Sequence, residues 1–231
     1  MHNERILWSI DEVATSEDRI ALDRQLRAGS HPFAYYAKHD HGTEAPEFFW
    51  GADLMVEGTS RYGGLAHASG RDVPDSLEAL PADGVARGVW ERIQTIFESA
   101  DFNVHGVFLN GQSYGQDGEI HRDWERPGEG YTFVVFMNTS WEAPWQGEAV
   151  FYDEHHTAIR WSVIPEPGRL VVFDGSIPHW GRAPARRYPG LRLTLAFHTT
   201  LADGSIFPDA SALRLGRSML LQKSGTAPRG T

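Results

Sequence analysis

The sequence of 231 residues contains no cysteine. This absence excludes disulfide frameworks, a catalytic thiolate and zinc sites built from cysteine ligands. Basic residues are also in deficit, because 21 Lys and Arg stand against 31 Asp and Glu, which gives a formal net charge of −10. A protein that binds a long stretch of nucleic acid needs a basic surface, so the charge argues against a nucleic-acid partner.

Long hydrophobic segments are missing as well. No apolar run approaches the roughly 18 residues that a membrane-spanning helix requires. The first residues include Glu4 and Asp11 and lack the apolar core of a secretory signal. These features predict a cytoplasmic protein without a membrane partner. We expect it to act on a small molecule or a peptide, as a monomer or a homodimer.

The pattern of apolar and turn-forming residues changes near residue 100. Before that point two segments predict helices. One begins at the polar cap Thr15 and ends near Gly29, and the other repeats apolar side chains at three- and four-residue intervals over residues 85–97. The stretch from His31 to Val73 is rich in glycine, histidine and aromatic residues, which predicts strands and loops.

After Ala100, short apolar runs alternate with turn-forming residues. The predicted strands are Val104–Leu109, Tyr131–Met137, Ala149–Tyr152, Trp161–Ile164, Leu170–Phe173 and Leu191–Phe197. Strands of this length and spacing are typical of a sandwich or barrel. We therefore expect one domain, mainly β with flanking helices (α+β). Residues 1–100 would form a helical and loop part that packs on the barrel, 101–200 the β core, and 201–231 a C-terminal extension.

One motif points to a different enzyme class. Residues 111–115 fit the G-x-S-x-G pattern of serine hydrolases, with Ser113 in the place of the nucleophile. Such a serine is held on a turn between a strand and a helix. The residues that follow, which include Gly118, are poor helix formers. The motif therefore favours an ordinary glycine-flanked turn, and a serine hydrolase is a minor alternative.

A separate set of residues predicts a metal centre. His121 and Asp123 are two residues apart in Glu119–Trp124, which we expect to be a strand, so both side chains would point to the same face. His179 follows another predicted strand and the turn Gly175–Pro178. Two imidazoles and one carboxylate form the facial triad that binds Fe(II) and leaves coordination positions open.

Such a site needs a cation for a cosubstrate that carries a carboxylate. Arg192 and Thr194 lie two residues apart in an apolar strand and therefore on one face. A guanidinium can hold a carboxylate through two hydrogen bonds, and a hydroxyl can assist. Arg187, in the proline-rich loop before this strand, is the alternative cation. Tyr114 precedes the metal segment and could add a phenol hydrogen bond.

In their order, these residues resemble the 2-oxoglutarate- and Fe(II)-dependent oxygenases, in particular the prolyl-4-hydroxylase-like group. The resemblance extends over residues 107–199. The matching segments are 114–123, 133–141, 146–151, 167–173, 177–179 and 192–194. Each motif is weak alone, and the specificity comes from their order and spacing.

The resemblance implies a double-stranded β-helix, or jelly roll, flanked by helices. It implies the cofactors Fe(II), 2-oxoglutarate and O₂, and the oxidation of a C–H bond with release of succinate and CO₂. The implied site residues are His121, Asp123 and His179 as catalytic iron ligands, with Arg192, Tyr114 and Thr194 around the C5 carboxylate of 2-oxoglutarate. Phe136 stands where some relatives have a second tyrosine.

The substrate is less constrained by the sequence. A compact acidic chain favours hydroxylation of a small molecule, such as an amino acid or a natural-product intermediate. A hydroxylase of a peptidyl or protein side chain is the alternative. A non-catalytic protein of the cupin type is disfavoured, because cupins use H-x-H with a glutamate. His198 matches in position the second arginine of the nucleobase demethylases, but the acidic balance argues against a nucleobase substrate.

Overall fold

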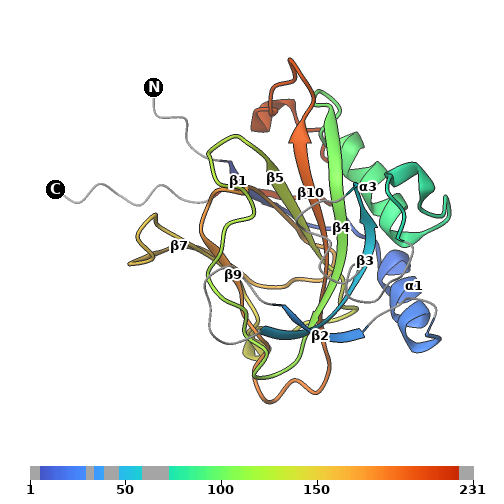
Figure 1. Ribbon diagram of the computed structural model, residues 1–231, viewed down its shortest axis with the longest axis vertical. Coiled ribbons are helices and arrows are strands. Elements are labelled where there is room, and N and C mark those ends of the chain that lie inside the picture. The colour runs from blue at the N-terminus through green and yellow to red at the C-terminus, as the bar shows by residue number, and fades with distance from the viewer. Residues whose placement is uncertain (1–5, 30–33, 39–46, 59–72, 224–231) are drawn as a thin grey trace.

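Two antiparallel sheets of unequal size form the molecule (Figure 1). The computed structural model describes residues 6–29, 34–38, 47–58 and 73–223. Within these ranges the larger sheet has the strand order β11-β1-β8-β5-β10-β4-β3-β2, and the smaller sheet has the order β7-β6-β9. The arrangement is a jelly roll with flanking helices, as the resemblance to the oxygenases implied.

The larger sheet takes strands from the whole described chain. Its strands are β1 (Leu7–Ile10), β2 (Ala34–Lys38), β3 (Glu47–Val56), β4 (Phe102–Gln112), β5 (Tyr131–Phe136), β8 (Leu170–Asp174), β10 (Arg192–Leu201) and β11 (Leu221–Lys223). The smaller sheet consists of β6 (Ala149–Tyr152), β7 (Ile159–Val163) and β9 (His179–Gly181). Short 3₁₀ turns occur at Leu77–Ala79, Ala143–Trp145 and Ala210–Ala212.

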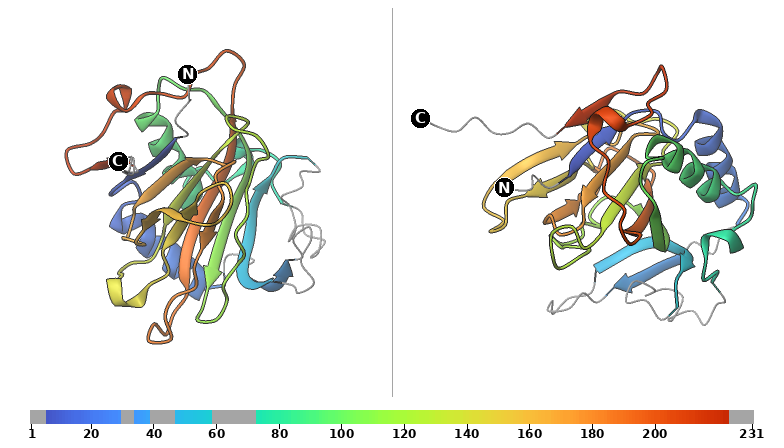
Figure 2. Two further views of the ribbon diagram at one scale, coloured as in Figure 1. Left: turned by 90° about the vertical axis from the view of Figure 1, so that its left-hand side faces the viewer. Right: turned by 90° about the horizontal axis from the view of Figure 1, so that it is seen from above.

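Two helices cover one face of the larger sheet (Figure 2). The first, α1 (Ser16–Arg27), begins with a capping box, in which the Thr15 hydroxyl accepts from the Asp18 amide and the Asp18 carboxylate accepts from the Thr15 amide. The second, α3 (Val85–Ile96), buries the apolar face that its sequence spacing predicted. Its Trp90 lies 5.0 Å from the Phe197 ring of β10, centroid to centroid.

Side-chain alternation along the central strands separates two cores. On β10, Leu193, Leu195 and Phe197 join the larger core, which includes the buried face of α3. The opposite face of the larger sheet packs against the smaller sheet, where Phe136 and Phe151 are buried together. Arg192 and Thr194 lie on this second face, because they alternate with the leucines. The polar side chains of the strand thus face the space between the sheets.

The strands predicted after Ala100 are present, with ends that shift by a few residues. The prediction of a strand over Glu119–Trp124 is wrong. There the chain forms one isolated antiparallel bridge, between His121 and His179, and then bends. The bend follows from two amides, those of Asp123 and Trp124, which both donate to the Gly175 carbonyl instead of to a neighbouring strand.

The serine motif forms a turn and is not followed by a helix. The Ser113 hydroxyl donates to Gln116 Oε1 at 2.8 Å, and Gly115 has a φ of +79°. This geometry agrees with the glycine-flanked turn and does not provide the strand–turn–helix of a nucleophile elbow.

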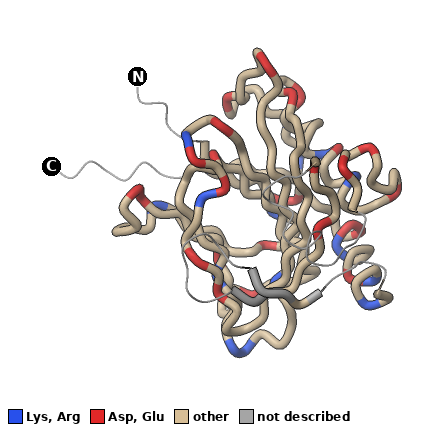
Figure 3. The backbone as a smooth tube through the Cα atoms, in the orientation of Figure 1, with Lys and Arg blue, Asp and Glu red and all other residues tan. Residues whose placement is uncertain are grey.

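Residues before the β core contribute strands as well as helices. Strands β2 and β3 fall in the stretch between His31 and Val73, where strands and loops were expected, although residues 31–33, 39–46 and 59–72 of that stretch lie outside the described ranges. At the N-terminal end of the described chain, β1 pairs with both β8 and β11. Acidic and basic residues are interspersed along the chain (Figure 3), and none of the described helices is long and apolar enough to cross a bilayer.

Candidate metal centre

Three predicted ligands meet between the two sheets. His121, Asp123 and His179 offer ligand atoms that all lie within 4.8 Å of one another. Nε2 of His121 is 3.6 Å from Asp123 Oδ1, and Nε2 of His179 is 3.5 Å from Asp123 Oδ2. Among the described residues, this is the one group of histidine and acidic side chains with the spacing to hold a metal ion.

Backbone carbonyls orient both imidazoles. Nδ1 of His121 lies 2.9 Å from the Glu119 carbonyl, and Nδ1 of His179 lies 3.0 Å from the Ile177 carbonyl. A carbonyl can only accept, so Nδ1 carries the proton of the neutral ring and Nε2 keeps its lone pair. Both lone-pair nitrogens are the ones nearest to Asp123. The donor set therefore fits a divalent ion of the Fe(II) type.

The two ligand segments are joined through the backbone. The His121 amide donates to the His179 carbonyl at 3.0 Å, and the reverse bond is 2.9 Å. Two residues further on, the Asp123 amide donates to the Gly175 carbonyl at 2.9 Å. Since Gly175 begins the turn that leads to His179, the two segments cannot move independently.

Trp124 is clamped beside the ligand pair. Its indole lies between Gly130 and Gly175, where a Cβ atom would approach ring atoms to 2.2 Å and 2.1 Å. Only glycine permits this approach at either position, because real Cβ atoms do not come so close to another heavy atom. Trp124 therefore packs the segment that carries His121 and Asp123 tightly against the turns next to β5 and β8.

The electrostatics keep the ligands in their metal-binding forms. Burial by itself raises the pKa of the Asp123 carboxyl, but the imidazoles of His198, His179 and His121 and the Thr132 hydroxyl outweigh it and hold that pKa well below its usual range. Burial lowers the pKa of His179 to about 4, against the attraction of Asp123. At neutral pH the carboxylate is thus ionised and the His179 imidazole is neutral, as metal ligation requires.

A buried guanidinium lies on the same sheet face. Arg192, only 4% exposed, donates from Nε to the Gly147 carbonyl at 2.6 Å and from Nη1 to Gln112 Oε1 at 2.9 Å. Its Cζ lies 5.1 Å from the centre of the Phe136 ring. Burial lowers the pKa of Arg192 to about 10, so the group is still a cation at neutral pH. These bonds leave Nη2 for an incoming anion.

The other predicted cosubstrate contacts differ in their surroundings. Thr194 is buried on the same strand face as Arg192. Tyr114, by contrast, is 60% exposed in the turn after β4. The alternative cation, Arg187, is exposed. Of the residues expected near the carboxylate, Arg192 and Thr194 share one buried face, whereas the side chain of Tyr114 is largely in solvent.

Three polar residues beside the centre were not singled out as site residues from the sequence. The Thr132 hydroxyl donates to Asp123 Oδ2 at 2.6 Å, His198 Nε2 lies 3.8 Å from the same oxygen, and Gln112 accepts from Arg192. Strand pairing explains their position, because Thr132 is opposite His198 and Gln112 is opposite Arg192. Local sequence contains no signal for these partners, although the spacing of His198 from Arg192 had been noted.

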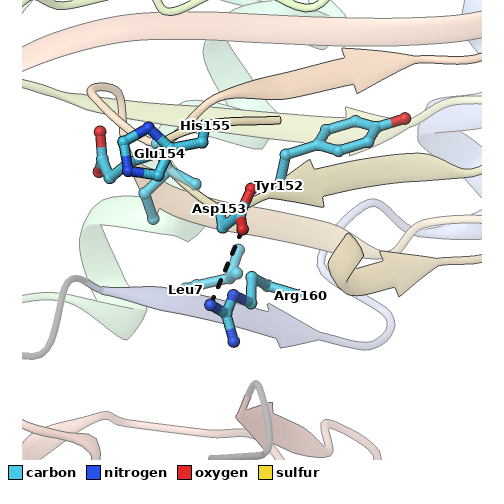
Figure 4. Close-up of a pocket in the computed structure, with 7 residues that line it drawn as sticks. Leu7, Tyr152, Asp153, Glu154, His155 and Arg160 are labelled. Carbon is cyan, nitrogen blue, oxygen red and sulfur yellow. Dashed lines mark ion pairs between the residues drawn. The ribbon is translucent and has the colours of Figure 1, made fainter. Parts of the chain in front are cut away.

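A cavity of about 430 Å³ lies beside the β6–β7 hairpin and β1, and none of the three ligands lines it (Figure 4). Its lining residues are Leu7, Tyr152, Asp153, Glu154, His155, Arg160 and Ile177. The Asp153 carboxylate is already engaged, since it accepts from the backbone and hydroxyl of Thr157 and pairs with Arg160 at 4.0 Å. The cavity adjoins the metal centre only through Ile177, whose carbonyl is the partner of His179 Nδ1.

Residues 109–198 match the family model described as the 2OG-Fe(II) oxygenase superfamily. A comparison with curated protein sequences gave no match. Similar solved structures share low sequence identity with this chain, so the comparison with them supports only the fold. One is the viral collagen prolyl hydroxylase vCPH from Paramecium Bursaria Chlorella virus-1 in its 2OG complex, with 12% identity, a TM-score of 0.52, and coverage of 86% of this chain and 98% of that one.

Two further structures have comparable scores. A prolyl hydroxylase from Trichoplax adhaerens, in complex with a hypoxia inducible factor oxygen degradation domain peptide fragment, has 12% identity and a TM-score of 0.53, covering 86% of this chain and 84% of that one. The non-heme alpha ketoglutarate dependent epimerase SnoN from nogalamycin biosynthesis has 10% identity and a TM-score of 0.50, covering 84% of this chain and 77% of that one.

Proposed function

We propose that this chain, of which residues 109–198 match the model of the 2OG-Fe(II) oxygenase superfamily, is a 2-oxoglutarate-dependent dioxygenase that hydroxylates an unactivated C–H bond of a small molecule. An amino acid or a natural-product intermediate is the substrate class proposed. Fe(II), 2-oxoglutarate and O₂ are the cofactors that membership of this family implies. The observation that carries the proposal is the convergence of two oriented imidazoles and one ionised carboxylate.

In the proposed site, His121, Asp123 and His179 hold Fe(II). Bound together, the iron and 2-oxoglutarate supply the oxidising chemistry, in which the cosubstrate loses CO₂ to become succinate and the two atoms of O₂ are divided between succinate and product. The protein contributes three oriented ligands in a partly buried location, where the side chains of His179 and Asp123 are 12% and 8% exposed. The carbonyl bonds to both Nδ1 atoms keep the rings aligned without further rearrangement.

Arg192 is proposed to bind the C5 carboxylate of 2-oxoglutarate. Its burial, its fixed guanidinium and the hydrogen bonds that already orient it support this role. A dicarboxylate that reaches from Arg192 to the metal would be anchored at both ends, and Thr194 on the same strand face could add a hydroxyl. Tyr114 would need to turn inward from its exposed position to contribute its phenol.

The surroundings of the centre support an organic substrate with an apolar portion. Val56, Phe108 and Ala196 form a small apolar cluster on β3, β4 and β10. The Phe108 ring lies 5.0 Å from the His198 ring, which in turn lies beside Asp123. A hydrocarbon group packed on this wall would sit next to the metal ligands, where a C–H bond must be placed for oxidation.

The test is conversion of 2-oxoglutarate to succinate in the presence of Fe(II), ascorbate and O₂, for the wild type and for His179→Ala. We expect the wild type to form succinate and His179→Ala to form almost none, because one of three ligands is lost. His155→Ala removes an exposed histidine outside the ligand set and is the matched control. Amino acids and short peptides added in parallel would raise succinate formation if they are substrates. A wild type that neither binds Fe(II) nor consumes 2-oxoglutarate would contradict the proposal.

A further inference from the structure

Thr132 makes a short hydrogen bond to the metal carboxylate. Its hydroxyl donates to Asp123 Oδ2 at 2.6 Å, a distance typical of a strong hydrogen bond to an ionised oxygen. The threonine is 2% exposed and lies in β5, opposite His198 of β10. A buried hydroxyl at this point has its single proton committed to a ligand rather than to the sheet.

We propose that Thr132 is a positioning residue of the metal centre, which fixes the rotation of the Asp123 carboxylate and so determines how its oxygens face the ion. The inference rests on the metal centre of the proposed function and assigns a role that the three ligands alone do not supply. Thr132 acts through Asp123 and does not itself touch the reacting groups.

The chemistry of the aspartate explains why such a residue is needed. The terminal torsion of an aspartate side chain is broad and roughly two-fold, so the carboxylate plane is poorly determined by its own rotamer. Asp123 also stands in an irregular bend and not in a strand, so no strand geometry holds it. Thr132, in contrast, is β-branched and sits in a paired strand, which restricts its χ1. The rigid element thereby orients the ligand of the irregular one.

His198 reinforces the same oxygen from the next strand. Its Nε2 lies 3.8 Å from Asp123 Oδ2, which is beyond hydrogen-bond distance but close enough for a favourable charge or dipole interaction. The pairing of Thr132 with His198 brings both groups to one side of the carboxylate. The opposite oxygen, Oδ1, is the one nearest to His121. The carboxylate is therefore held from the β5–β10 side.

A neighbouring threonine provides the matched control. Thr199 is fully buried and its hydroxyl donates to the Tyr131 carbonyl at 3.0 Å, so it serves the sheet backbone and no metal ligand. The two threonines lie in the same pair of strands, β5 and β10. Thr132→Val and Thr199→Val therefore remove comparable buried hydroxyls, and only the first removes the contact to Asp123.

The experiment is an anaerobic titration of the wild type, Thr132→Val, Thr132→Ser and Thr199→Val with Fe(II), followed by calorimetry, and with Co(II), followed by visible absorption. Because loss of a partner that orients a metal ligand typically weakens metal affinity about 10- to 100-fold, we expect a loss in that range for Thr132→Val. Thr132→Ser keeps the hydroxyl and should restore most of the affinity. Thr199→Val should bind metal as the wild type does, and the Co(II) spectrum should change only in Thr132→Val.

Equal affinities and unchanged Co(II) spectra for Thr132→Val and the wild type would overturn the inference. An equal loss in Thr132→Val and Thr199→Val would also overturn it, because the effect would then be structural. If the valine variant does not fold, Thr132→Ala and Thr132→Ser give the same comparison without the larger side chain, and equal affinities for these two count against Thr132. A wild type that binds neither metal would refute the metal centre itself and thus the proposed function.

Discussion

The two arginines that could bind the cosubstrate differ sharply in their surroundings. Arg192 is buried and held by the Gly147 carbonyl and Gln112, whereas Arg187 is exposed in the preceding loop. A carboxylate that replaces water beside a buried guanidinium gains a desolvated, charge-assisted pair, which an exposed arginine does not offer.

We therefore predict that Arg192→Ala raises the KM for 2-oxoglutarate far more than Arg187→Ala does. Removal of one partner of a buried charged hydrogen bond costs about 2–5 kcal/mol, which corresponds to at least roughly a 30-fold change. Steady-state succinate formation at varied 2-oxoglutarate concentration measures the effect. Metal affinity in the absence of 2-oxoglutarate should remain near that of the wild type. If Arg187→Ala has the larger effect, the carboxylate anchor must be reassigned to the loop.

The ligands and the supporting residues differ in how far the sequence reveals them. His121 and Asp123 stand two residues apart, and His179 follows a turn after an apolar strand. The spacing is weak evidence by itself, and the triad could be predicted only from the order and setting of these motifs together. Thr132 could not, because its contact with Asp123 depends on how a bend folds back over β5. Gln112 is likewise near Arg192 only through the register of β4 and β10.

Strands were predicted well where they are continuous apolar runs, and poorly where one bridge replaces a strand. The segment around His121 has alternating side chains, which suggested a strand of six residues. In the structure the Gly175 carbonyl captures the amides of Asp123 and Trp124 and ends the pairing after His121. This tertiary contact joins residues about fifty positions apart, so no local sequence pattern could predict it.

The clamp on Trp124 links the turns beside two strands, and it leads to a prediction for Gly175→Ala. A Cβ at this position would lie 2.1 Å from Trp124 Cδ1, so the indole or the turn must move, and the Asp123 amide bond to the Gly175 carbonyl moves with it. Overpacking of this kind costs about 1–3 kcal/mol. We expect a lower melting temperature and weaker Fe(II) binding, measured by thermal denaturation and calorimetric titration.

Two further variants make this prediction specific. Gly88→Ala in α3 is the control for an added methyl group, because a Cβ there meets no atom within 4 Å. In a Trp124→Leu background, Gly175→Ala should cost less than in the wild type, since the clashing ring is gone. If Gly175→Ala has the melting temperature and the Fe(II) affinity of the wild type, the close packing of Trp124 against Gly175 contributes to neither, and the prediction is wrong.

The jelly roll draws its metal ligands from segments far apart in the chain. His121 and Asp123 lie between β4 and β5, whereas His179 begins β9 of the smaller sheet. Strand β6 of that sheet packs against β8 of the larger sheet through the rings of Phe151 and Phe173. An ion held by all three would therefore connect the smaller sheet to the segment that leads into the larger one. Binding to the folded state alone stabilises that state by mass action.

This connection predicts that Fe(II) or a redox-stable substitute such as Co(II) raises the melting temperature of the wild type, and that a chelator reverses the shift. At a free metal concentration of 100 times Kd the gain is about 2.7 kcal/mol, which for a chain of this size corresponds to roughly 5–11 °C. His179→Ala should show no shift at the same concentration, whereas His155→Ala should shift as the wild type does. An equal shift in His179→Ala would mean that the ion stabilises the protein from another place, because an intact triad would then not be required.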